Sequence, residues 1–504
     1  MRPPVTPTSR GEAIERLRSE IFDVLVIGGG INGAGTARDL ALRAKNAQHP
    51  LRIALVDQNH FASGTSSKNS HLIHGGLRYL KQLDFALVRE ALHERKVLLH
   101  IAPHLVEPLP FLLPVAGRAR EIFYHLGLTI YDSFSDGFPR HRRLPLDEVH
   151  ELEPGLAVPG MTAAAEYYDA QVRSARLVLE NIFEAIANGA ACANYIRLES
   201  HESRGEWRVQ LHDMISDERF EARARALVDA TGPWARGPAP RLVRGSHIVL
   251  PRLNRSDHAV AYFESSGRIV FFIPWGERRD RTLIGTTDVD HSGSPDDVEI
   301  SSDETAYLRA IAAKIFPESA SLQPVASFSS LRPLLASHGS ATGATREHRI
   351  FYDPNGILRI TGGKFTTYRA MAEEAADLLT AKVAPHLKDI HATAETALNG
   401  NTSDAINALL SNASAIAGEY PVEPAEINRL VSQYGVLAPA VWEGMNEPSF
   451  PGLSRIDAAR MRFAIDHEMA QYPADFLEVS TSLAHDGRGN LLPPGAWPPR
   501  KSIQ

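Results

Sequence analysis

An apolar run near the start of the chain is followed at once by closely spaced glycines. The run Val24–Ile27 predicts a buried strand, and a helix of small residues is predicted after the glycines. The glycines have the spacing G-x-G-x-x-G: Gly28, Gly30 and Gly33. A second predicted strand, 52–56, ends in Asp57. This order predicts a Rossmann-like βαβ unit, whose helix N-terminus binds the pyrophosphate of a dinucleotide.

Each of these residues has a separate expected role. Gly28 permits the tight turn, Gly30 lets the backbone approach the pyrophosphate, and Gly33 lets the helix lie close to the sheet. Asp57 is placed to accept hydrogen bonds from the adenosine ribose.

Two later strand ends repeat the glycine pattern. Predicted strands at 224–230 and 356–360 run into Thr231-Gly232 and Gly362-Gly363, and a helix at 370–381 follows the second. Parallel strands bring their carboxyl ends to one crevice, so we expect a cofactor contacted by three distant segments. This favours FAD over NAD(P), whose site is usually completed within one contiguous domain.

The rest of the chain predicts further helices and a second sheet. Four strand-like runs separated by turn residues favour an antiparallel sheet that covers the substrate: 246–250, 260–263, 268–273 and 282–285. Helices are predicted at 14–22, 85–99 and 177–187. Residues 106–168 are rich in proline and are predicted to be irregular.

Together these elements predict an α/β protein that ends in a small all-helical domain. FAD-binding segments at about 20–110, 165–240 and 340–385 are expected to alternate with a substrate-binding sheet at about 110–165 and 241–340. A linker at 386–402, a helical domain at 403–485 and an irregular tail at 486–504 follow.

Composition narrows the class of protein further. The 504 residues carry a net charge of −7 and 43% apolar residues, which predicts two or three globular domains and no overall attraction to nucleic acid. Cys192 is the one cysteine, so no intramolecular disulfide is expected, and we expect it to be buried. No apolar run reaches the roughly 18 residues of a membrane span, and no secretory signal is expected, while peripheral attachment stays open. Without HExxH or CxxC spacing, we expect no metal.

Ten short motifs along residues 20–380 carry a family resemblance. They are Ile27–Gly35, Thr65–Ser67, Leu72–Leu80, Ala102–Leu105, Ala175–Val178, Asp229–Trp234, Gly245–Val249, Ile284–Asp288, Leu331–Leu334 and Gly362–Arg369. In these stretches the chain resembles the FAD-dependent, aerobic (respiratory) glycerol-3-phosphate dehydrogenases. The resemblance implies a glutathione-reductase-like or D-amino-acid-oxidase-like FAD domain with an antiparallel substrate domain.

The resemblance also implies an activity. A hydride passes from C2 of sn-glycerol 3-phosphate to the flavin, dihydroxyacetone phosphate forms, and the electrons go to a membrane quinone. Such an enzyme is expected in the cytoplasm, peripheral on the inner face of the cytoplasmic membrane, and a homodimer is a further expectation.

Site residues follow from the same resemblance. Substrate contacts are implied for Arg332 and Lys364, with Arg78 and Tyr79 in support and Thr287 and Asp288 orienting the substrate. His247 is favoured as proton acceptor, and His74 is the alternative. FAD contacts are expected from Gly28, Gly30, Asn32, Gly33, Asp57, Thr65, Ser66, Ser67, Gly75, Gly76, Thr231, Gly232, Gly362, Gly363 and Lys364.

The chain departs from the family pattern in three places. Arg173-Ser174 stands where acidic residues are usual, and Ser330-Leu331 precedes Arg332 where a Gly-Val pair is commoner. Residues 475–482 lack an expected basic run, which predicts weaker and more salt-sensitive membrane association.

Three other functions remain open from the sequence alone. They are an oxygen-using glycerol-3-phosphate oxidase, a flavin amine or amino-acid oxidase, and a flavin-binding regulator without turnover. A covalent flavin link through His60 or His71 is a further alternative.

Overall fold

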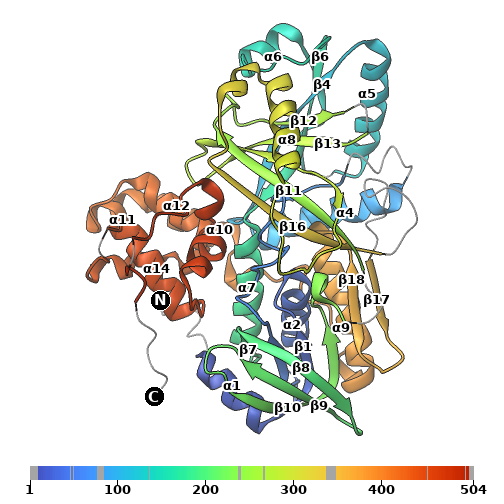
Figure 1. Ribbon diagram of the computed structural model, residues 1–504, viewed down its shortest axis with the longest axis vertical. Helices are drawn as coiled ribbons and strands as arrows, with labels where there is room; N and C mark the ends of the chain where they lie inside the picture. Colours follow the sequence, from blue (N-terminus) through green and yellow to red (C-terminus); the bar gives the residue numbers. More distant parts are fainter. Residues whose placement is uncertain are drawn as a thin grey trace.

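Two β-sheets, one at each end of the molecule, form the framework of this computed structural model (Figure 1). The structure describes residues 9–45, 47–48, 50–76, 84–135, 137–236, 240–264, 267–335, 348–450, 452–493 and 495–498. We call the sheet that contains the first strand sheet A and the other sheet B.

Sheet A contains the predicted βαβ unit. Its strand order is β17-β18-β10-β1-β2-β7, with β9 on β10 and β8 on β9. The strands are β1 (Ile21–Ile27), β2 (Ile53–Val56), β7 (Ala191–Ala193), β8 (Ile196–Ser203), β9 (Trp207–Asp213), β10 (Arg219–Asp229), β17 (His348–Tyr352) and β18 (Leu358–Gly362). Because β1, β2, β10 and β18 run parallel, their carboxyl ends meet at one edge, as the glycine pattern predicts.

Alternating side chains of β1 bury both faces of sheet A. Val24 and Val26 pack against α2 (Ile31–Ala44), α7 (Ser174–Ala187) and α9 (Tyr368–Val383). Leu25 and Ile27 face the other layer, which α1 (Arg10–Ser19) and the β8–β9 hairpin form. Burial on both faces explains why β1 reads as a continuous apolar run.

Cys192 lies fully buried in β7 of this sheet, as expected, and burial raises the pKa of its thiol to about 12.

Sheet B contains the predicted antiparallel strands. Its order is β15-β11-β14-β13-β12-β4-β6-β3, with β16 on β11 and β5 on β6. The strands are β3 (Leu72–Ile73), β4 (Val106–Val115), β5 (Arg142–Pro145), β6 (Ala163–Val172), β11 (Arg241–Pro251), β12 (Ala259–Phe263), β13 (Ile269–Trp275), β14 (Arg281–Gly285), β15 (Val289–Asp290) and β16 (Ala326–Leu334). The helix α8 (Ser302–Ile315) covers one face, and α4 (Phe85–Ile101) and α5 (Arg118–Ser133) cover the other.

The expectation that residues 106–168 are irregular is wrong. This stretch contains β4, α5, β5, the helix α6 (Leu146–Leu152) and the start of β6. Pro108, Pro110 and Pro114 occupy alternate positions of β4, so all three missing N–H groups face the same side of the strand. The intervening residues keep their donors for the ladder on the other side, and the ten-residue pairing with β6 persists. The first helix also lies earlier than predicted, because β1 already begins at Ile21.

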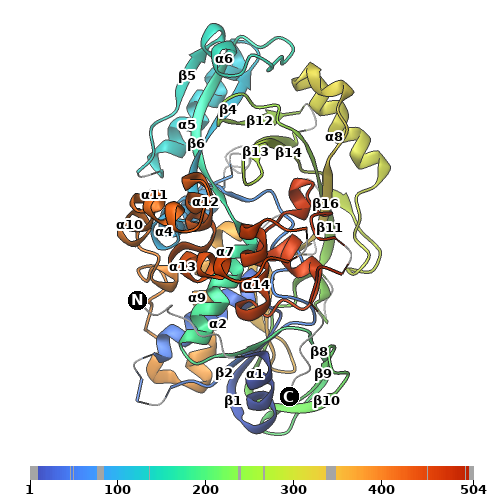
Figure 2. The ribbon, with the colours of Figure 1, turned by 90° about the vertical axis from the view of Figure 1, so that its left-hand side faces the viewer.

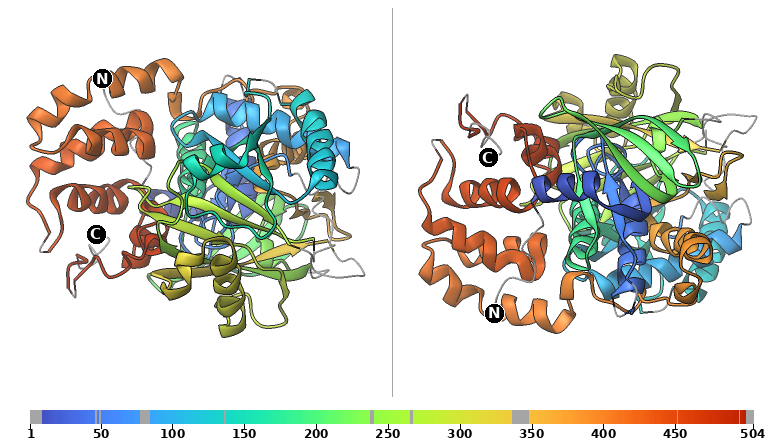
Figure 3. Two further views of the ribbon diagram at one scale, coloured as in Figure 1. Left: turned by 90° about the horizontal axis from the view of Figure 1, so that it is seen from above. Right: turned by 90° about the horizontal axis from the view of Figure 1, so that it is seen from below.

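The C-terminal helices form a separate layer on one side of the molecule (Figures 2 and 3). They are α10 (Ser403–Ser411), α11 (Ala413–Glu419), α12 (Pro424–Tyr434), α13 (Ala438–Glu443) and α14 (Arg455–His467), followed by a π-helical segment, Asp475–Ser480. Ser454 caps α14 by accepting the amide of Asp457 at 3.1 Å. The fold class is therefore as predicted, and the domain boundaries stay predictions.

A buried ion pair joins this helical layer to α7. Arg176 is 3% exposed and donates to Glu468, which is fully buried after α14. The guanidinium also lies over the Tyr434 ring, with its carbon 4.5 Å from the ring centroid, which adds a cation–π attraction.

Removing one member of this pair should cost more stability than replacing both. We expect Arg176→Met to destabilise the protein by about 3–5 kcal/mol, because Glu468 is then a buried charge without its partner. The double variant Arg176→Met/Glu468→Leu should recover much of that loss. Thermal and urea unfolding of the three proteins measure this, and equal losses in the single and double variants would contradict it.

Candidate functional site

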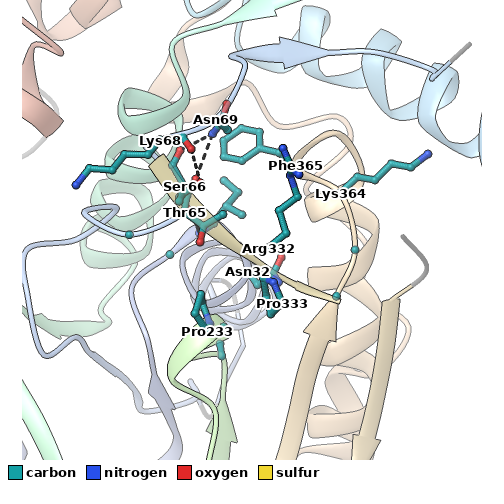
Figure 4. A pocket seen from close by; sticks show the side chains of 18 of the residues that line it. Asn32, Thr65, Ser66, Lys68, Asn69, Pro233, Arg332, Pro333, Lys364 and Phe365 are labelled. Atoms are coloured by element: carbon teal, nitrogen blue, oxygen red, sulfur yellow. Dashed lines mark hydrogen bonds between the residues drawn. The ribbon is translucent and has the colours of Figure 1, made fainter. Parts of the chain in front are cut away.

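A cavity of about 370 Å³ lies where the carboxyl ends of β1, β10 and β18 meet sheet B. This volume is in the range of small-molecule sites, roughly 300–1,000 Å³. Sheet A contributes backbone turns to its wall, and sheet B contributes the side chains of β11, β13 and β16. Figure 4 shows part of the lining.

The first glycine turn leaves no room for side chains. Gly28 has a φ of +108°, and a Cβ there would lie 2.5 Å from the carbonyl oxygen of Ala230. A Cβ on Gly33 would lie 1.9 Å from the carbonyl oxygen of Gly28. The helix α2 begins after Gly30 with neither a side-chain cap nor an acidic residue in its first turn. The amide of Ile31, the first residue of the helix, donates to Oγ of Ser66 at 3.0 Å, and the positive end of the helix dipole is suited to a phosphate.

Asp57 closes this turn from β2. Its Oδ2 accepts the amide of Gly29 at 2.6 Å, and its Oδ1 accepts the amide of Asn59 at 2.8 Å. Burial raises the pKa of the Asp57 carboxyl to about 6. The side chain lines the cavity, where the sequence predicts a ribose contact.

The two later glycine turns line the same cavity. Gly232 follows β10 with a φ of +60°, Gly362 ends β18 with a φ of +76°, and Gly363 comes next with a φ of +86°. A Cβ on Gly363 would lie 2.4 Å from Sδ of Met371 in α9. A short 3₁₀ turn, Phe365–Thr367, separates this turn from α9.

His247 reaches the cavity from β11. Its Nε2 lies 2.9 Å from Oγ of Ser70, and its ring stacks on Phe328. Burial, and next the positive charge of Arg332, hold the pKa of the imidazole well below its usual value. The ring is therefore neutral at physiological pH and can accept a proton. A Cβ on Gly285 would lie 2.2 Å from the imidazole, so β14 needs glycine there.

Arg332 is held in β16 by polar partners that include Asp288 and Thr286. Its Nη1 donates to Asp288, and its Nη2 donates to Oγ1 of Thr286 at 2.8 Å. A Cβ on Gly245 of β11 would lie 2.2 Å from Nη2, so the guanidinium lies directly over that glycine. Asp288 thus orients Arg332, as well as lining the cavity.

The other predicted residues fall into three groups. Those that line the cavity are Asn32, Thr65, Ser66, His74, Gly76, Thr231 and Lys364. Those outside its lining are Gly33, Ser67, Gly75, Thr287, His60 and His71. Figure 4 shows the Lys364 side chain extending away from Arg332. Arg78 and Tyr79 lie outside the described residues.

Two residues outside the lining support those that form it. Thr287 accepts the amide of Ser246 at 2.9 Å and donates to Glu304 at 2.7 Å. Gly75 donates its amide to the Tyr131 hydroxyl at 2.9 Å, in a place where a Cβ would collide with that ring.

Sequence reasoning missed several lining side chains. Ser70 and Asn69 belong to a loop rich in hydroxyl side chains. Such a loop does not pack well in a hydrophobic core, and this could have indicated that it lines a binding site. Tyr167 and Asp169 line the cavity from β6, which the proline content of the preceding residues concealed. Arg173 and Ser174, which depart from the family pattern, both have polar partners. Oγ of Ser174 lies 2.9 Å from Nδ1 of His71, and Nη2 of Arg173 donates to Oγ of Ser432 at 3.3 Å.

The donor set fits FAD. Three positive-φ glycine turns and the N-terminus of α2 bring backbone to the cavity wall, where the Asp57 side chain also lies, and aromatic and hydroxyl side chains complete the lining. The model of the FAD dependent oxidoreductase family matches residues 23–378. The chain belongs to this family. FAD is its cofactor.

Three similar proteins among the FAD-dependent oxidoreductases are described as glycerol-3-phosphate dehydrogenases. A glycerol-3-phosphate dehydrogenase from Synechocystis sp. is 35% identical, and the match covers 93% of this chain and 90% of the relative. The aerobic glycerol-3-phosphate dehydrogenase of Escherichia coli is 37% identical, over 72% of this chain and 74% of the relative. The crystal structure of glycerol-3-phosphate dehydrogenase from Bacillus halodurans complexed with FAD is 28% identical. Its TM-score is 0.76, with coverage of 95% of this chain and 90% of that one.

The FAD affinity of this oxidoreductase should depend on the Asp57 carboxylate. Ribose hydroxyls donate to the ionised form, so affinity is complete above the pKa of about 6 and falls as pH drops through it. We expect a loss of up to about tenfold per pH unit below that value.

Titration of the FAD-free protein with FAD from about pH 5 to pH 8 measures this dependence. The Asp57→Asn variant should bind FAD more weakly and with little pH dependence. Equal pH dependence in the two proteins would contradict the assignment.

Proposed function

We propose that the protein oxidises the C2 hydroxyl of sn-glycerol 3-phosphate to the ketone of dihydroxyacetone phosphate. The observation that carries the proposal is the meeting of the FAD cradle with Arg332 and a neutral His247 in one cavity. The names of the relatives support this substrate.

Arg332 provides the anchor for the substrate phosphate. A guanidinium bonds two phosphate oxygens at once, and Asp288 and Thr286 already hold this one in a single orientation. Lys364, His74, Arg78 and Tyr79 remain predicted contributors.

His247 accepts the proton of the C2 hydroxyl. Burial beside Arg332 keeps the imidazole neutral before the reaction, and it also makes the ring a weaker base, so the position of the ring carries this role. Ser70 fixes the ring through its 2.9 Å contact with Nε2. The bound FAD supplies a hydride acceptor, so that the hydroxyl loses a proton and a hydride and becomes a carbonyl.

Electron delivery to a membrane quinone is part of the proposal. Among the described residues, no helix is both long and apolar enough to cross a bilayer. The helix α5 instead exposes three large apolar side chains on one face: Ile122 at 69%, Phe123 at 52% and Leu126 at 62%. The exposed Arg118 and Arg120 begin the same helix. Apolar side chains beside arginines fit the interface of an anionic bilayer, and α5 lies at the opposite end of the molecule from sheet A (Figure 1).

Anaerobic addition of sn-glycerol 3-phosphate to the purified yellow protein tests the activity. We expect the flavin absorbance to bleach. A yellow protein that does not bleach would favour an amine oxidase or a regulator. Comparison of peroxide yield with quinone reduction then separates an oxidase from a dehydrogenase.

Two variants test the assigned roles. His247→Gln should keep bound FAD and slow its reduction by about 10²- to 10⁴-fold, because the amide cannot take a proton. Arg332→Lys should raise the substrate concentration for half-maximal rate by roughly 10- to 100-fold, because the ammonium cannot form the two-pronged contact. His291→Gln and Arg281→Lys, which do not line the cavity, are matched controls. Wild-type kinetics in either test variant would remove that residue from the assignment.

Membrane contact should depend on α5 and on salt. We expect the protein to float with anionic liposomes at low salt and to dissociate at high salt, because the C-terminal basic run is absent. Ile122→Ser/Leu126→Ser should abolish flotation without changing anaerobic bleaching. A matched change on another exposed side chain, Val325→Ser, should float normally. Flotation that survives high salt, or that survives the double change, would contradict this surface.

A further inference from the structure

Phe328 lies between two histidines that are far apart in the sequence. His247 faces Phe328 across the β11–β16 ladder, with ring centroids 5.0 Å apart and planes 20° apart. His485 flanks the same phenyl ring with centroids 4.5 Å apart and an interplanar angle of 35°. The C-terminal segment therefore supplies part of the wall behind the cavity.

The turn that carries His485, Ala484–Asp486, is fastened to sheet B. The carbonyl oxygen of His485 accepts Nε1–H of Trp275 in β13 at 3.2 Å. Gly487 follows with a φ of +81°, and a Cβ there would lie 3.0 Å from the carbonyl oxygen of Val325, just before β16. The backbone thus holds the imidazole against Phe328.

The three packed rings exclude water. His247 is 2% exposed, Phe328 is 6% exposed and His485 is 4% exposed. Among the described residues, the charged or titratable groups that act on His247 are Arg332 of β16, which pairs with Asp288 after β14, His71 before β3, and His485, on which Lys68 acts in turn. Burial lowers the pKa values of His71 and His485 to about 3, so both are neutral.

We propose that His485 is a positioning residue for His247. By packing on Phe328, it holds the His247 ring against Ser70 and keeps water from the rear of that ring. This inference rests on the proposed function, in which His247 is the proton acceptor.

Loss of the His485 ring has two consequences for His247. The space behind Phe328 admits water, so the desolvation that holds the pKa of His247 low is relieved. The imidazole also gains freedom to leave Ser70. The freed imidazole lowers the fraction of enzyme with a correctly placed base and so lowers kcat, the raised pKa moves the acid limb of the pH profile, and Arg332 and phosphate binding are untouched.

The test compares His485→Ala with His485→Phe in the full-length, FAD-loaded protein. We expect His485→Ala to lower kcat about tenfold with an unchanged KM, and to move the acid limb of the kcat/KM profile upward by about one pH unit. His485→Phe restores an apolar ring and should return both values to near wild type. His467→Ala is the matched control, because the His467 ring also packs on a phenyl ring, that of Phe463 with centroids 4.8 Å apart, and has no contact with Phe328 or His247 among the described ring pairs.

A wild-type kcat and pH profile in His485→Ala would overturn the inference, as would a His485→Phe variant no better than the alanine variant. If the alanine variant does not fold, His485→Gln replaces it. The glutamine side chain has no ring and the phenylalanine side chain has one, so the comparison is the same. NMR titration of ¹³C-labelled His247 needs no substrate. This titration therefore tests the positioning role of His485 without any turnover. If the wild-type protein fails to oxidise sn-glycerol 3-phosphate, only the proposed function is overturned.

Discussion

The close approach of α2 to the ends of β1 and β10 is the constraint on which the rest of the structure depends. Gly28 and Gly33 meet at a distance that no side chain tolerates, and Ala230 closes the turn from β10. This contact aims the N-terminus of α2 at the cavity and sets the depth at which a pyrophosphate can lie. Sheet B then has to reach that position from outside, which it does through β11 and β16.

The sequence predicts the parts of the site that depend on backbone geometry. Gly28, Gly232 and Gly363 are recognisable from the sequence because a turn at a strand end often needs a positive φ, which glycine adopts without strain. The strands of sheet B between 246 and 288 were recognisable from turn residues between short apolar runs. The fold class follows from these two patterns.

The remaining features depend on tertiary partners that no local pattern records. The prolines of β4 suggested an irregular segment, although pairing with β6 accommodates them on one side of the strand. Ser70 became part of the site only because β11 places His247 against it. Lys364 shares a motif with the cofactor turn, yet its side chain extends away from Arg332 (Figure 4). The motif predicted that Lys364 lies near the cofactor turn, and the backbone at the end of β18 sets the direction of its side chain.

The burial of Cys192 has a consequence for the whole molecule. Its thiol lies in the middle of β7, with no exposed surface and with a pKa of about 12. Almost no thiolate forms at physiological pH, and the thiolate is the species that oxidants and alkylating reagents attack. A flavoprotein that releases some peroxide would therefore not inactivate itself through its own sulfhydryl group. Because Cys192 is inert, a thiol-reactive label would modify only a cysteine that is introduced at the surface, and Cys192 would not need to be replaced first.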